Sequence, residues 1–139
     1  MSRVQLDTDI FSEVLKGVDR RVVATATAYQ AAYGHYTISS ITVMEIVKGF
    51  HKLQREDRIQ RFRAILQAVE VLVMDAPIAE LAGRIYADLE RTGQPIGRAD
   101  PIIAACAVHH GLILVTGNTA HYARIQALGY DLLLDNWRT

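Results

Sequence analysis

The hydrophobic positions of this chain follow two spacings, short continuous runs and longer stretches with a helical repeat. The short runs predict strands buried on both faces, as in a parallel sheet. Strands are predicted at residues 3–6, 36–38, 71–74, 112–115 and 132–134, and helices at 10–15, 18–33, 43–53, 76–91, 102–108 and 122–125. This alternation predicts an α/β fold with three layers, α/β/α, around a central, mainly parallel sheet of four to five strands.

The stretch from residue 96 to residue 118 contains the clearest signals. Asp100 precedes Pro101, which suits the first turn of a helix because its missing N–H would be unpaired there anyway. Gly111 ends that helix, and an apolar strand follows. Asn118 comes just after the strand, so we expect Asp100 and Asn118 to face one crevice, of the kind in which α/β sheets bind ligands.

Three acids, Asp7, Glu45 and Asp100, each stand where a predicted strand meets a predicted helix. If the sheet is parallel, these junctions share one edge and the carboxylates converge. Each acid also has a purely structural interpretation: Asp7 and Asp9 with Thr8 form a helix cap, and Glu45 in a first turn complements the helix dipole.

A cluster of carboxylates is costly by itself, because like charges raise one another's pKa. A divalent cation removes that cost, and carboxylate oxygens suit Mg²⁺ or Mn²⁺. Such an ion can supply an attacking water for phosphodiester cleavage. The three acids together therefore indicate a candidate metal site with Asp7, Glu45 and Asp100 as ligands.

Composition narrows the classes of protein that fit. The 139 residues suffice for one domain, residues 1–139, and the formal net charge of zero argues against a histone-like binder of polyanions. The single cysteine, Cys106, excludes an internal disulfide and lies in a predicted buried helix, which disfavours a thiol enzyme. The five histidines lack the spacing of a zinc enzyme. We expect no signal peptide and no membrane span, and hence a cytoplasmic protein.

A basic run follows Glu45. Lys48, His51, Arg55 and Arg58 recur at helical spacing, with Lys52, Arg61 and Arg63 nearby. Such a run is usually a solvated face, and phosphate contact is the alternative, since lysine and arginine bind phosphates without reading sequence. No aromatic residues interleave with these charges, so a base-stacking platform is not indicated.

Five motifs carry a resemblance to a known family. They read L-D-T-D at 6–9, I-S-S-I-T-V-M-E at 38–45, I-G-R-A-D at 96–100, L-V-T-G-N-T at 114–119 and D-N-W at 135–137. In this order they resemble the PIN domain, and most closely the VapC toxins of type II toxin–antitoxin pairs. The resemblance implies a metal-dependent endoribonuclease, usually a homodimer, neutralised by a small VapB-type antitoxin, with DNA contacted only through the antitoxin. Asp7, Glu45 and Asp100 fall on the family's acidic positions.

The chain departs from the family pattern at its fourth acid. Many members carry an acid in the loop after the fourth strand, where Asn118 and His121 stand here. Asn118 can still offer a carbonyl oxygen or hold a water, which predicts weaker or single-ion binding. Asp9, often Asn in relatives, adds a charge in partial compensation, and Thr116 belongs to the same loop motif.

Three other interpretations remain open. The D-x-D of Asp7 and Asp9 is similar to that of HAD-type phosphohydrolases, although Phe11 stands where Thr or Val is usual and no later acidic pair follows a strand. A receiver domain phosphorylated near Asp75 would need a lysine after the fifth strand, and residues 132–139 contain none. A PIN fold kept only as a binding module would explain the missing fourth acid.

Overall fold

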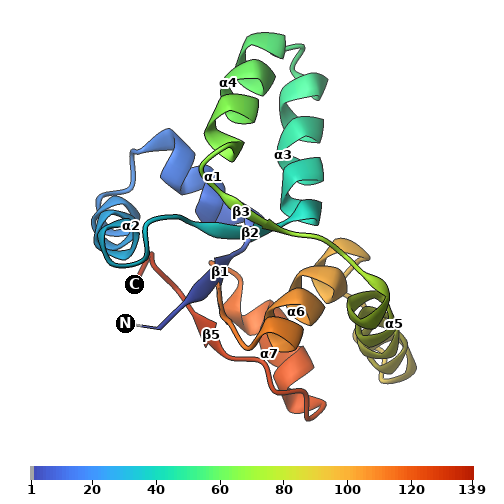
Figure 1. Cartoon of the computed structure of the whole chain (residues 1–139). Helices are drawn as coiled ribbons and strands as arrows, with labels where there is room; N and C mark the ends of the chain where they lie inside the picture. Colours follow the sequence, from blue (N-terminus) through green and yellow to red (C-terminus); the bar gives the residue numbers. More distant parts are fainter. Residues whose placement is uncertain (1) are drawn as a thin grey trace.

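Short strands and longer helices alternate along the described chain, residues 2–139 of the computed structural model (Figure 1). The predicted domain, 1–139, extends beyond these residues by Met1. The elements are β1 (Val4–Leu6), α1 (Thr8–Lys16), α2 (Arg20–Tyr33), β2 (Thr37–Ser39), α3 (Ser40–Lys52), α4 (Glu56–Leu66), β3 (Glu70–Leu72), α5 (Ala76–Arg91), α6 (Ala99–His110), β4 (Ile113–Val115), α7 (Thr119–Ala127) and β5 (Leu134–Asp135). The predicted alternation of α and β elements is confirmed.

The strands pair only in parallel, as predicted, but in two hydrogen-bonded groups. One group has the order β1-β4-β5 and the other joins β2 to β3. β1 lies beside β2, which brings the two groups together into one layer. The strands are short because capping side chains start helices at their carboxyl ends: Asp7 follows β1 directly, and Ser39 is the last residue of β2. The carboxyl ends of β1, β2 and β4 therefore meet at one edge.

Several predicted boundaries are corrected by local capping. The second helix begins at Arg20 rather than at residue 18, because the side chain of Asp19 accepts a hydrogen bond from the N–H of Val22. The last strand is shorter and later than predicted, at Leu134–Asp135. Helix α3 begins at Ser40, so Glu45 lies in its second turn and the prediction of a first-turn dipole role for Glu45 was wrong.

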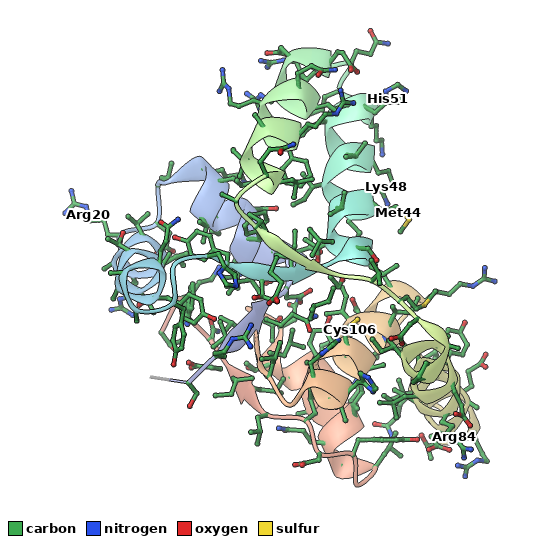
Figure 2. The ribbon with its side chains drawn as sticks, in the orientation of Figure 1. Arg20, Met44, Lys48, His51, Arg84 and Cys106 are labelled. Atoms are coloured by element: carbon green, nitrogen blue, oxygen red, sulfur yellow. The ribbon has the colours of Figure 1, made fainter. Side chains whose placement is uncertain are left out.

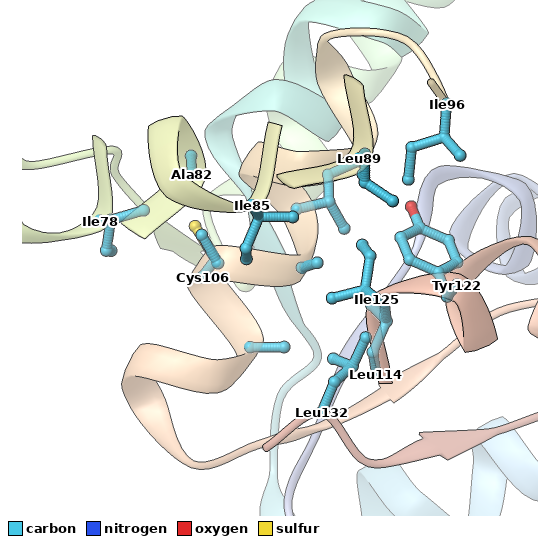
Figure 3. Close-up of a cluster of buried hydrophobic side chains, with 14 residues drawn as sticks. Ile78, Ala82, Ile85, Leu89, Ile96, Cys106, Leu114, Tyr122, Ile125 and Leu132 are labelled. Atoms are coloured by element: carbon cyan, nitrogen blue, oxygen red, sulfur yellow. The ribbon is translucent and has the colours of Figure 1, made fainter. Parts of the chain in front are cut away.

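Hydrophobic side chains fill both sides of the strand layer. Figure 3 shows the cluster in which α5, α6 and α7 pack against β4, with Cys106 buried among aliphatic side chains. A second cluster joins α1 to α4 with β1 and β2, and includes Phe11, Tyr29 and Trp137. Helix α6 is apolar all round, since it is covered by both α5 and the sheet.

Helices α3 and α4 extend beyond the strand layer as an antiparallel pair, here called the α3–α4 arm (Figure 1). Phe50 and Phe62 meet edge to face between the two helices, with ring centroids 6.5 Å apart. Across residues 2–139, none of the helices combines the length and apolar character that a membrane span requires.

Candidate active site

Asp7 is the most buried acid at the shared strand edge, with 5% of its surface exposed. One carboxylate oxygen, Oδ1, accepts the N–H of Thr8 at 2.8 Å and caps α1, and the other, Oδ2, accepts the hydroxyl of Thr116 at 2.8 Å. Burial, followed by the negative charge of Asp9, raises the pKa of Asp7 to about 6. The cap and the candidate ligand are thus the same side chain.

Asp9 lies two residues after Asp7 and forms an ion pair with the C-terminal segment. Its Oδ1 accepts the N–H of Ile10 at 2.8 Å, and its Oδ2 accepts the N–H of Gly117 at 2.9 Å. The guanidinium of Arg138 lies 3.5 Å from the same Oδ2 and 3.6 Å from Glu13. Asp9 therefore joins α1 to the loop after β4 and to the C-terminal segment.

Glu45 reaches the edge from α3 and accepts a hydrogen bond from one hydroxyl group, which is itself bonded to a second. The hydroxyl of Thr8 lies 2.6 Å from Oε1 of Glu45 and 2.9 Å from the hydroxyl of Thr42. Because one hydroxyl donates only one hydrogen, Thr42 donates to Thr8 and Thr8 donates to Glu45. This relay fixes the carboxylate of Glu45 beside the residue that follows Asp7.

Asp100 lies in the first turn of α6, as predicted. Its Oδ2 is 2.7 Å from Nε2 of His121, and its Oδ1 accepts the hydroxyl of Tyr122 at 3.1 Å. Burial, and then the negative charges of Asp7 and Asp100, raise the pKa of the Tyr122 phenol. Tyr122 therefore stays protonated and donates its hydrogen to Asp100, in surroundings where Asp7 also contributes negative charge.

The predicted site residues gather at one edge but do not form a finished ligand cage. Within residues 2–139, no group of three His, Cys, Asp or Glu side chains is arranged to hold a metal ion. Asp7 and Asp100 share the environment of Tyr122, whereas Glu45 is tied to Thr8. The donors are nonetheless hard carboxylate oxygens, and the pKa of Asp7 is raised by burial and then by neighbouring negative charge, both of which a bound cation offsets. The donor chemistry fits Mg²⁺ or Mn²⁺.

The loop after β4 places its predicted residues at the same edge. Thr116 is buried, donates to Asp7, and accepts the N–H of Asn118 at 3.0 Å. Asn118 precedes α7, and its side chain makes no capping hydrogen bond. His121 contacts Asp100 from the first turn of α7. Within residues 2–139, the side-chain amide of Asn118 thus does not cap α7.

Sequence reasoning missed four residues that position the acids: Thr8, Thr42, Tyr122 and Arg138. Thr8 and Tyr122 each stand next to a predicted site residue, and that adjacency was an available signal. Thr42 lies on α3 three residues before Glu45, so helical spacing was a signal for it, whereas Arg138 reaches the site from the C-terminal segment, which no local pattern reveals.

A groove of about 770 Å³ opens beside the site, between α1, α3 and α4. Its inner end holds Thr8 and Glu45, and Lys16, Arg58 and Arg61 line it as well. Apolar side chains form the rest of its wall: Leu15, Val18, Ile46, Phe50, Leu53, Phe62 and Ile65. The groove offers an apolar channel that leads to an acid.

The PIN domain family model matches residues 4–127, and the chain therefore belongs to the PIN domain family. Two relatives define its group. The tRNA(fMet)-specific endonuclease VapC of Shigella flexneri is 33% identical over 92% of this chain and 96% of its own length. Ribonuclease VapC2 of Haemophilus influenzae is 33% identical over 99% of both chains. Within the family, the chain belongs with the VapC ribonucleases.

A solved structure agrees with this group. DNA-bound VapBC from Salmonella typhimurium contains a chain that superposes with a TM-score of 0.82 at 30% identity, over 99% of both chains. The predicted PIN-like fold and the family resemblance are confirmed. This membership removes the HAD-type and receiver-domain alternatives, and Asp75, required by the latter, is the N-cap of α5.

Proposed function

We propose that this chain is a metal-dependent endoribonuclease toxin that hydrolyses RNA phosphodiester bonds and is neutralised by a small VapB-type antitoxin. The single observation that supports it most is the gathering of Asp7, Glu45 and Asp100 at one strand edge in a chain of the VapC group. The two relatives are named as an endonuclease and a ribonuclease, which supports the same activity for this chain.

Mg²⁺ or Mn²⁺ would be held by Asp7, Asp100 and Glu45, directly or through water. When bound, the ion supplies a Lewis acid and an activated water for attack on phosphorus. In the present arrangement Glu45 and Asp100 are engaged by Thr8 and His121, so ion binding exchanges those hydrogen bonds for metal contacts. We therefore expect weak binding of a divalent ion, in keeping with the neutral Asn118.

The remaining side chains at the strand edge orient the three acids through hydrogen bonds. Thr116 donates a hydrogen bond that holds Asp7 in one orientation, and Tyr122 does the same for Asp100. Thr8 keeps Glu45 at the inner end of the groove. Asn118, next to them, offers an amide that can orient a water or a phosphate oxygen.

The test is cleavage of RNA with Mg²⁺ or Mn²⁺, with and without EDTA. Asp7→Asn, Glu45→Gln and Asp100→Asn should each abolish cleavage while circular dichroism shows an intact fold. Asp131→Asn, an exposed acid just before β5, is the matched control and should keep full activity. Normal cleavage by Asp100→Asn contradicts the site. A wild-type chain that never cleaves RNA but binds an antitoxin is a PIN-fold binding module instead.

The antitoxin part of the proposal rests on the groove. An apolar peptide segment fits its wall, and an arginine from that peptide suits the acids at its inner end, because the guanidinium fork matches a carboxylate. Co-expression with the cognate antitoxin should give a stable complex without ribonuclease activity. A complex that stays fully active would exclude this mode of inhibition.

A variant of the groove wall tests antitoxin binding separately from ribonuclease activity. Ile65→Glu, on the groove wall, should weaken the complex, while Val73→Glu, at an apolar residue that is exposed outside the groove, should not. Homodimerisation and a cytoplasmic location, which the resemblance and the composition imply, stay predictions. Light scattering at several concentrations would test the dimer. DNA is expected to contact the assembly through the antitoxin.

A further inference from the structure

The charges of this neutral chain are distributed unevenly. Residues 48–63, which form the outer part of the α3–α4 arm, contain six of the fifteen lysines and arginines but only two of the fifteen acids. Residues 48–63 therefore carry a net charge of +4, and the rest of the chain carries −4. The net charge of the chain is zero, yet the outer part of the α3–α4 arm is strongly basic and lies beside the acidic candidate site.

Within the arm, three side chains form what we call the outer stripe: Lys48, His51 and Lys52. Lys48 and Lys52 are four residues apart on α3, so they share one helical face, with His51 beside them. All three are exposed, and none makes an ion pair or a side-chain hydrogen bond to any residue of the described range 2–139. Figure 2 shows Lys48 and His51 pointing outward from α3, on the side away from α4.

The outer stripe begins at the acid edge. Lys48 lies three residues after Glu45, less than one helical turn along the axis, and Met44 extends the same face with 56% of its surface exposed. The stripe is separate from the groove, because Lys48, His51 and Lys52 do not line it. A strand bound along this stripe would reach Glu45, at the inner end of the groove, without passing between α3 and α4.

We propose that the outer stripe binds the sugar-phosphate backbone of the RNA strand and guides it to Glu45. This inference rests on the proposed ribonuclease function. Charge complementarity supports it, since unpaired lysines and an imidazole donor suit successive phosphate oxygens. A second copy of this chain does not fit, because a two-fold contact centred on the stripe would place lysines against lysines.

The experiment measures binding apart from cleavage. Fluorescence anisotropy with a labelled, unstructured RNA oligonucleotide in EDTA gives the affinity at several salt concentrations. For a single strand, each phosphate contact contributes about 0.7 to the slope of log affinity against log salt. The double variant Lys48→Gln, Lys52→Gln should lower the magnitude of that slope by about 1.4, whereas Lys48→Arg, Lys52→Arg should retain it.

The matched control is Arg20→Gln, Arg84→Gln, which removes the same charge from exposed sites on α2 and α5 (Figure 2). It should leave the slope nearly unchanged. In Mg²⁺ or Mn²⁺, the lysine variant should raise KM more than it lowers kcat, because it removes binding that does not change in the transition state.

Two results would overturn the inference. One is a lysine variant with the same slope as the control, while the wild type still cleaves RNA. The other is an unchanged slope with an altered oligomeric state, which would make the stripe a contact between copies. If the wild type neither binds nor cleaves RNA, the proposed function itself fails.

Discussion

Asp7 caps α1 and accepts a hydrogen bond from the hydroxyl of Thr116. It is also the most buried acid of the candidate site. Two hydrogen bonds do not offset its burial beside Asp9 and Asp100, which is why its pKa rises rather than falls. In the metal-free protein, the ionised carboxylate of Asp7 therefore destabilises the fold.

This predicts an unusual pH dependence of stability. The pKa of Asp7 is 3.8 without perturbation and about 6 in the folded chain, so between these values the folded state binds more protons than the unfolded state. Stability should fall as pH rises from about 4 to about 6, by on the order of 3 kcal/mol, and then level off.

Urea unfolding in EDTA at pH 4.5, 6 and 7.5 would measure the effect of Asp7. The variant Asp7→Asn should flatten the decrease and be the more stable protein at pH 7.5. Asp131→Asn serves as the control for loss of an exposed acid. A wild type that becomes steadily more stable between pH 4.5 and 6 would refute the assignment.

Asn118 supports a second prediction at the residue scale. Its side chain is not used as a cap, so Asn118→Asp should fold normally and add a carboxylate at the edge. A further charge near a divalent ion is worth roughly 1–2 kcal/mol at 4 Å in water-like surroundings, which is about tenfold in affinity. Calorimetric titration with Mn²⁺ would compare the two proteins. Equal affinities and equal cleavage rates would place Asn118 outside the working site.

At the scale of elements, helix α5 depends on its cap. The side chain of Asp75 accepts the N–H of Ile78 at 3.1 Å, and Pro77 occupies an early helical position. Asp75→Ala should cost about 1 kcal/mol, and Asp75→Asn, which keeps an acceptor, much less. Thermal unfolding would measure both. RNA cleavage should be unchanged, and a loss of cleavage with intact stability would give Asp75 a chemical role.

The loop between β4 and α7 depends on a close approach at Gly117. A Cβ there would lie 2.6 Å from Oδ2 of Asp9 and would also meet the guanidinium of Arg138. Gly117→Ala should displace Asp9, break its hydrogen bond from the N–H of Gly117, and cost about 1–2 kcal/mol. Gly83→Ala on α5, where a Cβ meets nothing within 4 Å, should stabilise by about 0.5–1 kcal/mol.

At the scale of the whole molecule, the two hydrophobic clusters are joined through the sheet. Leu114 belongs to one cluster and Val115, its neighbour in β4, to the other, and β4 pairs with β1. Both clusters pack against β4, so unfolding of either one would expose hydrophobic side chains of the other. We therefore expect one cooperative unfolding transition, as for a single domain. Trp137 fluorescence and far-ultraviolet circular dichroism should give the same midpoint. Two separate midpoints would contradict the single-domain prediction.

The order and type of the elements were determined by the sequence alone, except that helix α4 (Glu56–Leu66) was not predicted as an element separate from α3. Asp75, the αL residue Gly111 and the early Pro101 act on neighbouring backbone groups, so their effect can be predicted from the adjacent sequence. Apolar runs identified the buried strands for the same reason. The motif resemblance then identified the family, and with it the placement of Asp7, Glu45 and Asp100 on acidic positions.

Only the tertiary structure decided how those acids are held. Their partners come from elements far along the chain: Thr116 for Asp7, Thr8 for Glu45, and Tyr122 for Asp100. The raised pKa of Asp7 depends on burial and on neighbouring charge, which no local pattern encodes. Likewise, a net charge of zero could not disclose the basic arm, since charge acts through its position in space rather than through its sum.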